Sequence, residues 1–152
     1  MQLFKKKYSN EEALKRIQKY CVYQDRCHKE VNEKLFEWGF DPEDRGNIVI
    51  KLIEQGFLNE ERFAKAFVRG KFRLKKWGKI KILRELKQKG ITDNLIKLAL
   101  KEIDDKEYLT TLKKIITSKE KQIKEDNQYK KMARVAQFTT SKGYEQELIW
   151  NI

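Results

Sequence analysis

The sequence is poor in helix breakers and in the residues that build metal centres. It contains one proline, two cysteines and one histidine in 152 residues. Cys21, Cys27 and His28 lack the paired spacing of a zinc site and offer at most three ligands. A disulfide between the two cysteines is not expected in a reducing compartment. We therefore predict ordinary packing or surface roles for these three residues, and neither a metal nor another cofactor.

Long apolar runs are also missing. No stretch approaches the length needed to cross a bilayer, and the N-terminal segment MQLFKKKYSN has no apolar region after its lysines. These features predict a soluble, cytoplasmic protein with no membrane partner.

Combinations of residues that perform catalysis are equally scarce. The sole histidine lies beside the two cysteines in a helical region, and neither a glycine-rich phosphate loop nor a carboxylate pair in an evident pocket is found. Asp104 and Asp105 are better explained as a helix cap followed by a first-turn acid. The sequence thus predicts no catalytic residue and a protein that is not an enzyme.

Helical periodicity dominates the chain. Apolar residues recur three and four positions apart almost throughout, which predicts an all-α fold. Candidate helix starts are Ser9 with Glu12, Asp41 before Pro42, Asn59, and Thr92. The predicted helices span residues 10–24, 28–38, 42–55, 60–75, 78–89, 92–103, 105–124, 128–142 and 145–151.

An internal repeat is indicated by three glycines in one setting. LFEWGFD, LKQKGIT and TTSKGYE place Gly39, Gly90 and Gly143 between two helical stretches, at intervals of 51 and 53 residues. Each glycine can end a helix in the left-handed conformation, with the next apolar residue packing back. We predict three tandem three-helix repeats, at 1–56, 57–103 and 104–152, stacked in an elongated, slightly curved row. The short last helix leaves open whether the third repeat is complete.

Positive charge is concentrated in the middle repeat. Residues 57–103 hold 14 basic and five acidic residues, whereas residues 1–56 have a net charge of +1 and residues 104–152 of +2. Within KFRLKKWGKIKILRELKQK, residues 71–89, nine cations face a single acid, Glu85. Solubility alone does not require such a distribution.

Helical spacing sorts these cations onto faces. In residues 60–76 it places Phe63, Phe67, Gly70 and Leu74 on a core face and Lys65, Arg69, Arg73 and Lys76 on the opposite one. In residues 78–89, Ile82, Leu83 and Leu86 are expected inside, and Lys81, Arg84 and Gln88 outside, with Trp77 entering on their side.

Two interpretations of this face compete. It is either a solvated helix exterior or a surface for a polyanion, and the lack of interspersed acids favours the second, since like charges at i,i+4 repel. Trp77 could stack on a base or insert at an interface, or simply pack at the corner between the two helices. Lys113, Lys114 and Lys121 of the third repeat are expected to contribute much less to binding.

Residues 52–96 resemble the RecX family. The family pattern GYLDDERFAxxFVxxR is met here by Gly56-Phe57-Leu58, Asn59 to Arg62, Phe63-Ala64 and Phe67-Val68-Arg69. The pattern GxxxIxxELxxKGI is met by Gly78, Ile82, Glu85-Leu86 and Lys89-Gly90-Ile91. Where many members have proline and arginine after the glycine, this chain has Lys79 and Ile80, so the placement of cations differs.

The resemblance implies tandem three-helix repeats and a role in DNA repair and recombination. It implies a regulator that binds in the groove of the RecA recombinase filament, restrains the recombinase and binds single- or double-stranded DNA. The seven candidate binding residues are Lys65, Arg69, Arg73, Lys76, Trp77, Lys81 and Arg84. We expect a monomer, because no dimerisation helix is evident. The alternatives are a stand-alone helix-turn-helix DNA binder, with residues 78–89 as its recognition helix, and a helical scaffold whose charge serves solubility.

Overall fold

The computed structural model describes residues 4–152 and is helical throughout, with no strand in that range. Its nine helices are α1 (Asn10–Tyr23), α2 (His28–Glu37), α3 (Pro42–Glu54), α4 (Glu60–Lys75), α5 (Lys79–Gln88), α6 (Asp93–Leu100), α7 (Asp105–Gln122), α8 (Gln128–Ser141) and α9 (Gln146–Trp150). Every predicted helix is present. The all-α prediction is confirmed.

The helix starts follow the predicted caps with one exception. The side chains of Ser9, Asp41 and Asn59 each accept a hydrogen bond from an amide in the first turn of their helices. Thr92 occupies the cap position of α6, but its hydroxyl accepts no such bond. Its carbonyl instead accepts the Ile96 amide at 3.0 Å.

The repeated glycines end helices as predicted. Gly39, Gly90 and Gly143 have φ values of +82°, +79° and +100°, in the left-handed region where a side chain would be strained. The residues that follow them, Phe40, Ile91 and Tyr144, are buried. At each of these glycines the chain thus folds an apolar residue back under the preceding helix.

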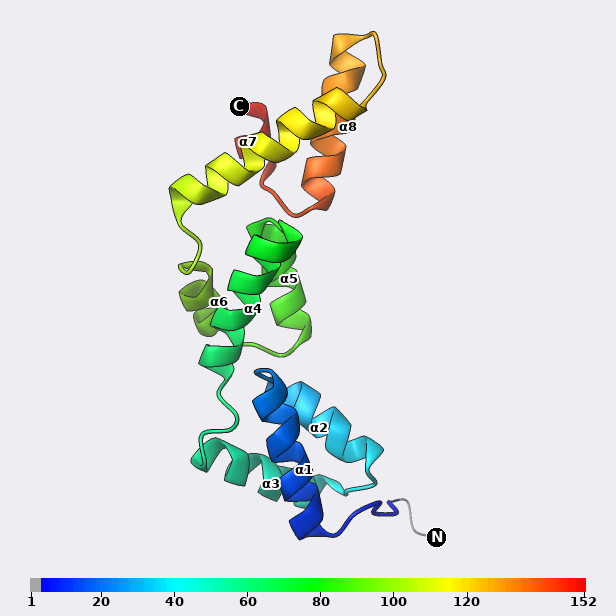
Figure 1. Cartoon of the computed structure of the whole chain (residues 1–152), viewed down its shortest axis with the longest axis vertical. Helices are drawn as coiled ribbons and strands as arrows, with labels where there is room; N and C mark the ends of the chain where they lie inside the picture. Colours follow the sequence, from blue (N-terminus) through cyan, green and yellow to red (C-terminus); the bar gives the residue numbers. More distant parts are fainter. Residues whose placement is uncertain (1–3) are drawn as a thin grey trace.

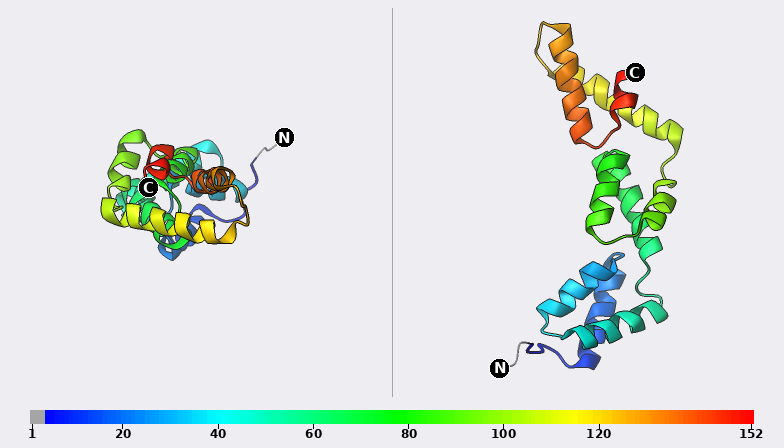
Figure 2. Two further views of the ribbon diagram at one scale, coloured as in Figure 1. Left: turned by 90° about the horizontal axis from the view of Figure 1, so that it is seen from above. Right: turned by 180° about the vertical axis from the view of Figure 1, so that it is seen from behind.

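The helices form three groups stacked end to end (Figures 1 and 2). The helix pairs that pack most extensively lie within α1–α3, α4–α6 or α7–α9, which we call the first, middle and third repeats. The predicted row of three-helix repeats is confirmed.

Two apolar cores run through this row. One belongs to the first repeat and includes Ile17, Leu35 and Leu52. The second is continuous through the middle and third repeats, from Phe63 to Ile149, and includes Cys27 from the first. The middle and third repeats therefore share one core.

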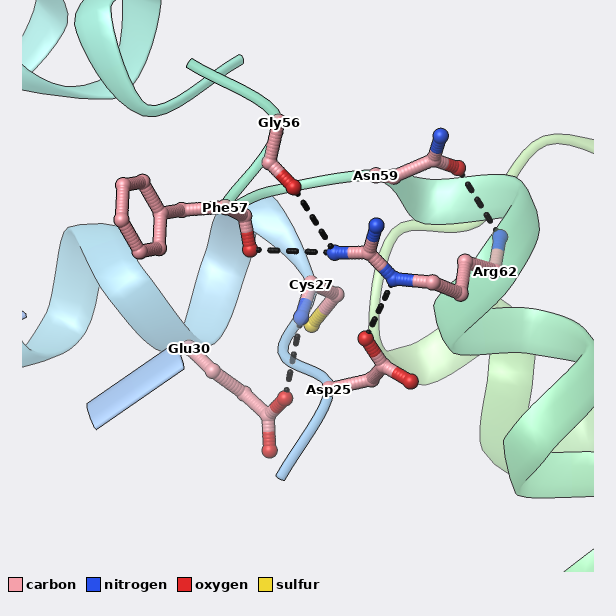
Figure 3. Close-up of polar contacts among 7 residues, drawn as sticks. All are labelled: Asp25, Cys27, Glu30, Gly56, Phe57, Asn59 and Arg62. Carbon is pink, nitrogen blue, oxygen red and sulfur yellow. Dashed lines mark hydrogen bonds and ion pairs between the residues drawn. The ribbon is translucent and has the colours of Figure 1, made fainter. Parts of the chain in front are cut away.

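Polar contacts join the first repeat to the middle one; we call this the first joint. Arg62 of α4 donates to the Asp25 carboxylate at 2.6 Å and to the carbonyl oxygens of Gly56 and Phe57, both at 3.2 Å (Figure 3). One guanidinium thus links the α1–α2 connection, the α3–α4 connection and α4.

Backbone hydrogen bonds and stacked tyrosines join the middle repeat to the third; we call this the second joint. The amides of Gly78 and Ile80 donate to the carbonyls of Lys142 and Gly143, at 2.8 and 2.9 Å. Tyr108 and Tyr144 stack with ring centroids 5.1 Å apart. The start of α5 is therefore held against the end of α8.

Candidate nucleic-acid interface

The seven candidate residues lie at separate places on the middle repeat rather than on one face. Lys65 and Arg69 sit beside acids. The Arg69 Nη1 atom is 2.6 Å from the Glu102 Oε1 atom, and the Lys65 Nζ atom is 3.8 Å from the Glu61 Oε2 atom. The expected absence of neighbouring acids is therefore wrong at these two positions. The sequence does not reveal Glu102 as a partner of Arg69, because the two residues lie 33 positions apart.

Arg73 and Arg84 are two freely presented cations. Both side chains are exposed. Neither has a carboxylate partner within 4.0 Å in residues 4–152. They are available to an external anion without breaking an internal ion pair.

Trp77 lies between two lysines. The Nζ atoms of Lys71 and Lys81 are 4.9 and 4.4 Å from the centroid of its ring system, within the range of cation–π attraction. The indole also packs edge-on against Phe67, with centroids 6.4 Å apart, and is half-buried. Trp77 therefore has a packing role, and its ring also contacts two lysines. One of them, Lys71, was not among the predicted residues.

The predicted core face of α4 is open at one end. Phe63 is buried, Phe67 is half-buried, and Leu74 is 83% exposed, so the prediction is wrong for Leu74. The helix packs through the adjoining stripe of Ala64, Val68 and Phe72 instead, because α5 and α6 meet α4 there. The stripe from Phe63 to Leu74 lines a groove of about 510 Å³.

This groove combines apolar and charged walls. Trp77, Lys71, Lys75 and Lys89 border it together with Glu85, and Asp25 and Glu30 of the first repeat close one end. It therefore lies against the first joint, and its charged lining is balanced, with three lysines and three carboxylates.

Lys76 belongs to a different place. It ends α4 in the left-handed conformation, with φ of +59°, and lines a hollow between α7 and α8. Its carbonyl oxygen accepts the Tyr144 hydroxyl at 2.9 Å. A regular helix would place Lys76 on the same face as Lys65 and Arg69. Because Lys76 adopts the left-handed conformation where α4 ends, its side chain leaves that face.

The two cysteines are buried and their thiols are free. Burial raises the pKa of Cys27 to about 11, so its thiol is protonated at neutral pH. His28 contacts Glu60, whose Oε1 atom is 3.6 Å from its Nδ1 atom. In residues 4–152 no group of three potential ligands is arranged to hold a metal ion.

Comparison with known proteins finds similarity to one family. A model of the RecX second three-helix domain matches residues 59–100, a range that contains all seven candidate residues. Regulatory protein RecX of Lactobacillus johnsonii is 33% identical over 114 residues, covering 75% of this chain and 42% of the relative. The RecX crystal structure from Lactobacillus salivarius matches with a TM-score of 0.83 and 25% identity, over 93% of this chain and 92% of that one. The chain is similar to RecX proteins over most of its length.

Similarity to the family extends well beyond the middle repeat. Regulatory protein RecX of Clostridium tetani is 31% identical over 135 residues, covering 88% of this chain and 60% of the relative. The chain spans 42% of the length of the Lactobacillus johnsonii relative. Within the described range, no helix is long and apolar enough to cross a bilayer.

Proposed function

We propose that this chain regulates the RecA recombinase by binding the RecA–DNA filament, and that it contacts DNA through the basic face of the middle repeat. We use the name basic face for four cations at separate places on the surface of this repeat: Arg73, Arg84 and the lysines on Trp77, namely Lys71 and Lys81. The protein acts as a cytoplasmic monomer and has no enzymatic activity of its own.

The observation that carries the proposal is the exposure of unpaired cations inside the segment that matches the family. Arg73 and Arg84 have no carboxylate partner in the described chain, while Lys71 and Lys81 are held on the Trp77 ring system. Like charges repel when they are gathered without acids, and backbone phosphates remove that cost. A side chain such as Trp77 adds a flat surface beside these charges.

The elongated shape supports the same function. The three repeats form a narrow row whose length exceeds its width (Figures 1 and 2). Such a row can follow the groove of a helical filament over several contacts, which a compact domain of the same size cannot do. Contacts distributed along the row favour a polymeric partner.

The helix-turn-helix alternative is less compatible with the second joint. A recognition helix reads base edges with its N-terminal residues. Here the third repeat covers the start of α5, because the Gly78 and Ile80 amides bond to Lys142 and Gly143, and the Lys79 amide donates to the Tyr108 hydroxyl at 3.0 Å. That end of α5 is occupied within the chain.

The direct test is RecA-driven strand exchange, with its DNA-dependent ATPase activity, measured with and without the protein. We expect a change in both rates on addition of the protein. A triple substitution, Arg73→Gln with Lys81→Gln and Arg84→Gln, should greatly reduce that change. DNA affinity should lose about two to three units of salt slope, at about 0.7 to 0.9 per lost phosphate contact.

A matched control removes three cations from the first repeat. Lys15→Gln, Lys19→Gln and Lys51→Gln change exposed lysines and alter the net charge by the same amount. This variant should keep most of the effect on the recombinase. Equal losses from both triples would show that only total charge matters, and an unchanged recombinase with the unsubstituted protein would refute the proposed regulation.

A further inference from the structure

The third repeat has a basic surface that its net charge conceals. From Tyr108 to Lys119, and again from Gln128 to Tyr144, the sequence contains three and four cations and no acid. The acids of this repeat lie at the ends of its helices and in the α7–α8 connection, for example Asp105 and Glu125. The bodies of α7 and α8 are therefore strongly basic although the repeat as a whole is nearly balanced.

These two helices pack together and leave a cleft of about 320 Å³ beside the end of α4. Its lining is Lys76, Thr111, Lys114, Ile115, Ser118, Lys119, Gln122, Phe138 and Lys142. In the part of the chain that the structure covers, none of the four lysines has a carboxylate within 4.0 Å. Lys119 lies over the Phe138 ring, with its Nζ atom 4.1 Å from the centroid.

The walls of this cleft are fixed by the second joint. The Lys76 carbonyl accepts the Tyr144 hydroxyl at 2.9 Å, and the Lys142 carbonyl accepts the Gly78 amide at 2.8 Å. Because both backbone positions are tied, Lys76 and Lys142 are kept at the same cleft. Converging cations bind an anion more favourably when the chain does not have to bring them together first.

A second hollow continues the cleft along α7. It has a volume of about 450 Å³ and is lined by Thr110, Lys113, Lys114, Thr117, Ser118 and Lys121. Lys114 and Ser118 line both hollows. Because they share these two residues, the two hollows adjoin and form a track of lysines and hydroxyls along α7.

The chemistry of this track matches a row of phosphates. Lysine ammonium groups and the hydroxyls of serine and threonine are donors that commonly contact backbone phosphate oxygens. Two adjoining basic hollows suit repeated charges along a polymer better than one small anion. The track begins at Lys76, three residues after the exposed Arg73 of the middle repeat.

We propose that the α7–α8 cleft and the adjoining hollow bind successive backbone phosphates of a DNA strand, and that Lys76 connects this track to the basic face of the middle repeat. This inference rests on the proposed function for the identity of the polyanion. It also revises the expectation that Lys113, Lys114 and Lys121 contribute little.

The test is DNA binding by the full chain with Lys114→Gln, Lys119→Gln and Lys142→Gln combined. Affinity for a single-stranded oligonucleotide of mixed sequence is measured by fluorescence anisotropy over about 50 to 200 mM salt. We expect the salt slope to fall by about two units, at about 0.7 per lost contact on a single strand. The matched arginine variant, Lys114→Arg with Lys119→Arg and Lys142→Arg, should restore binding, because it keeps the charges.

The control changes three lysines of the same repeat that line neither hollow, Lys106→Gln, Lys124→Gln and Lys130→Gln. A loss of slope equal to that of the cleft variant would overturn the inference, as would an unaltered slope in a cleft variant that remains folded by thermal unfolding.

The same assay separates this inference from the proposed function. If the cleft variant binds normally while the middle-face triple fails, the cleft is not a DNA site and the proposed face stands. The opposite pattern would retain the cleft and refute the middle face.

Discussion

The two joints of the row are built from different interactions. At the first joint, side-chain ion pairs predominate: Arg62 with Asp25 at 2.6 Å and Lys89 with Glu30 at 3.5 Å. At the second, backbone hydrogen bonds and the stacked rings of Tyr108 and Tyr144 predominate. One exposed ion pair, Lys79 with Asp105 at 3.5 Å, lies beside them. The apolar core is continuous across the second joint, whereas at the first it receives only Cys27.

The difference between the joints indicates which parts of the row move together. Ion pairs between partly exposed groups contribute little net stability and are weakened by salt. The backbone hydrogen bond of the buried Gly78 and the stacking of two buried tyrosine rings cannot be exchanged for water without cost. The middle and third repeats therefore form one body that carries the proposed DNA surfaces, and the first repeat is attached by a joint that adjusts more easily.

The largest expected effect comes from adding a methyl group at the second joint. A Cβ atom on Gly78 would overlap the carbonyl carbon and oxygen of Gly143, both backbone atoms that cannot move aside alone. We expect Gly78→Ala to destabilise the protein by about 2–4 kcal/mol, through overpacking and weakened backbone bonds. Chemical denaturation measures this change.

The matched control is Gly46→Ala in α3. A Cβ atom there meets nothing within 4 Å, and the residue lies inside a helix. This change should leave stability unaltered or raise it by about 0.4–1 kcal/mol, because alanine restricts the unfolded chain. If the two substitutions changed stability equally, the close approach of Gly78 to the Gly143 backbone would not contribute to stability.

A smaller loss is expected from Tyr144→Phe. The ring and its stacking remain, but the Lys76 carbonyl loses the hydroxyl that bonds to it at 2.9 Å. We expect a cost of about 1 kcal/mol in unfolding free energy. Tyr129→Phe, at a residue 80% exposed, should change stability by less than about 0.5 kcal/mol. An equally small effect at Tyr144 would contradict the assigned role of this bond.

The smallest effect on stability is expected at the first joint, where opening can be followed chemically. Arg62→Ala should cost about 1 kcal/mol or less, since the pair with Asp25 is partly exposed. It should nevertheless speed labelling of Cys27 by a thiol reagent at about pH 8. At this pH the closed joint keeps the thiol protonated, because burial raises its pKa to about 11.

Cys21 supplies an internal control for that experiment, because it lies in the first repeat's own core. Its labelling rate should change much less than that of Cys27. Arg16→Ala, which removes an ion pair within α1, should affect neither thiol. If Arg62→Ala accelerated both thiols equally, the first repeat would be unfolding and the joint would not be opening.

Local signals in the sequence explain why the fold could be predicted in detail. Caps such as Asp41 and terminating glycines such as Gly90 act within a few residues, so each helix is specified by its own neighbourhood. The equivalent sequence surroundings of Gly39, Gly90 and Gly143 then predicted three tandem repeats. The same reasoning erred at Leu74, because helical spacing does not reveal that α5 and α6 pack on the adjoining stripe.

The candidate site was less predictable because its electrostatics depend on contacts distant in sequence. Arg69 is neutralised by Glu102, and Lys76 leaves its stripe because it turns left-handed. A net charge for the whole third repeat also hid the acid-free bodies of α7 and α8. Outside the first and last turns, neither α7 nor α8 contains an acid, and only a count made helix by helix reveals this.

Amide hydrogen exchange tests the contrast between the joints most directly, because one amide reports on each. The His28 amide donates to the Glu60 carboxylate at 3.1 Å across the first joint, and the Gly78 amide donates to the Lys142 carbonyl at 2.8 Å across the second. Raising the salt concentration to about 1 M shortens the Debye length to about 3 Å and weakens ion pairs. We predict that exchange at His28 becomes faster while Gly78 stays protected. Equal acceleration at both amides, or at neither, would contradict the account.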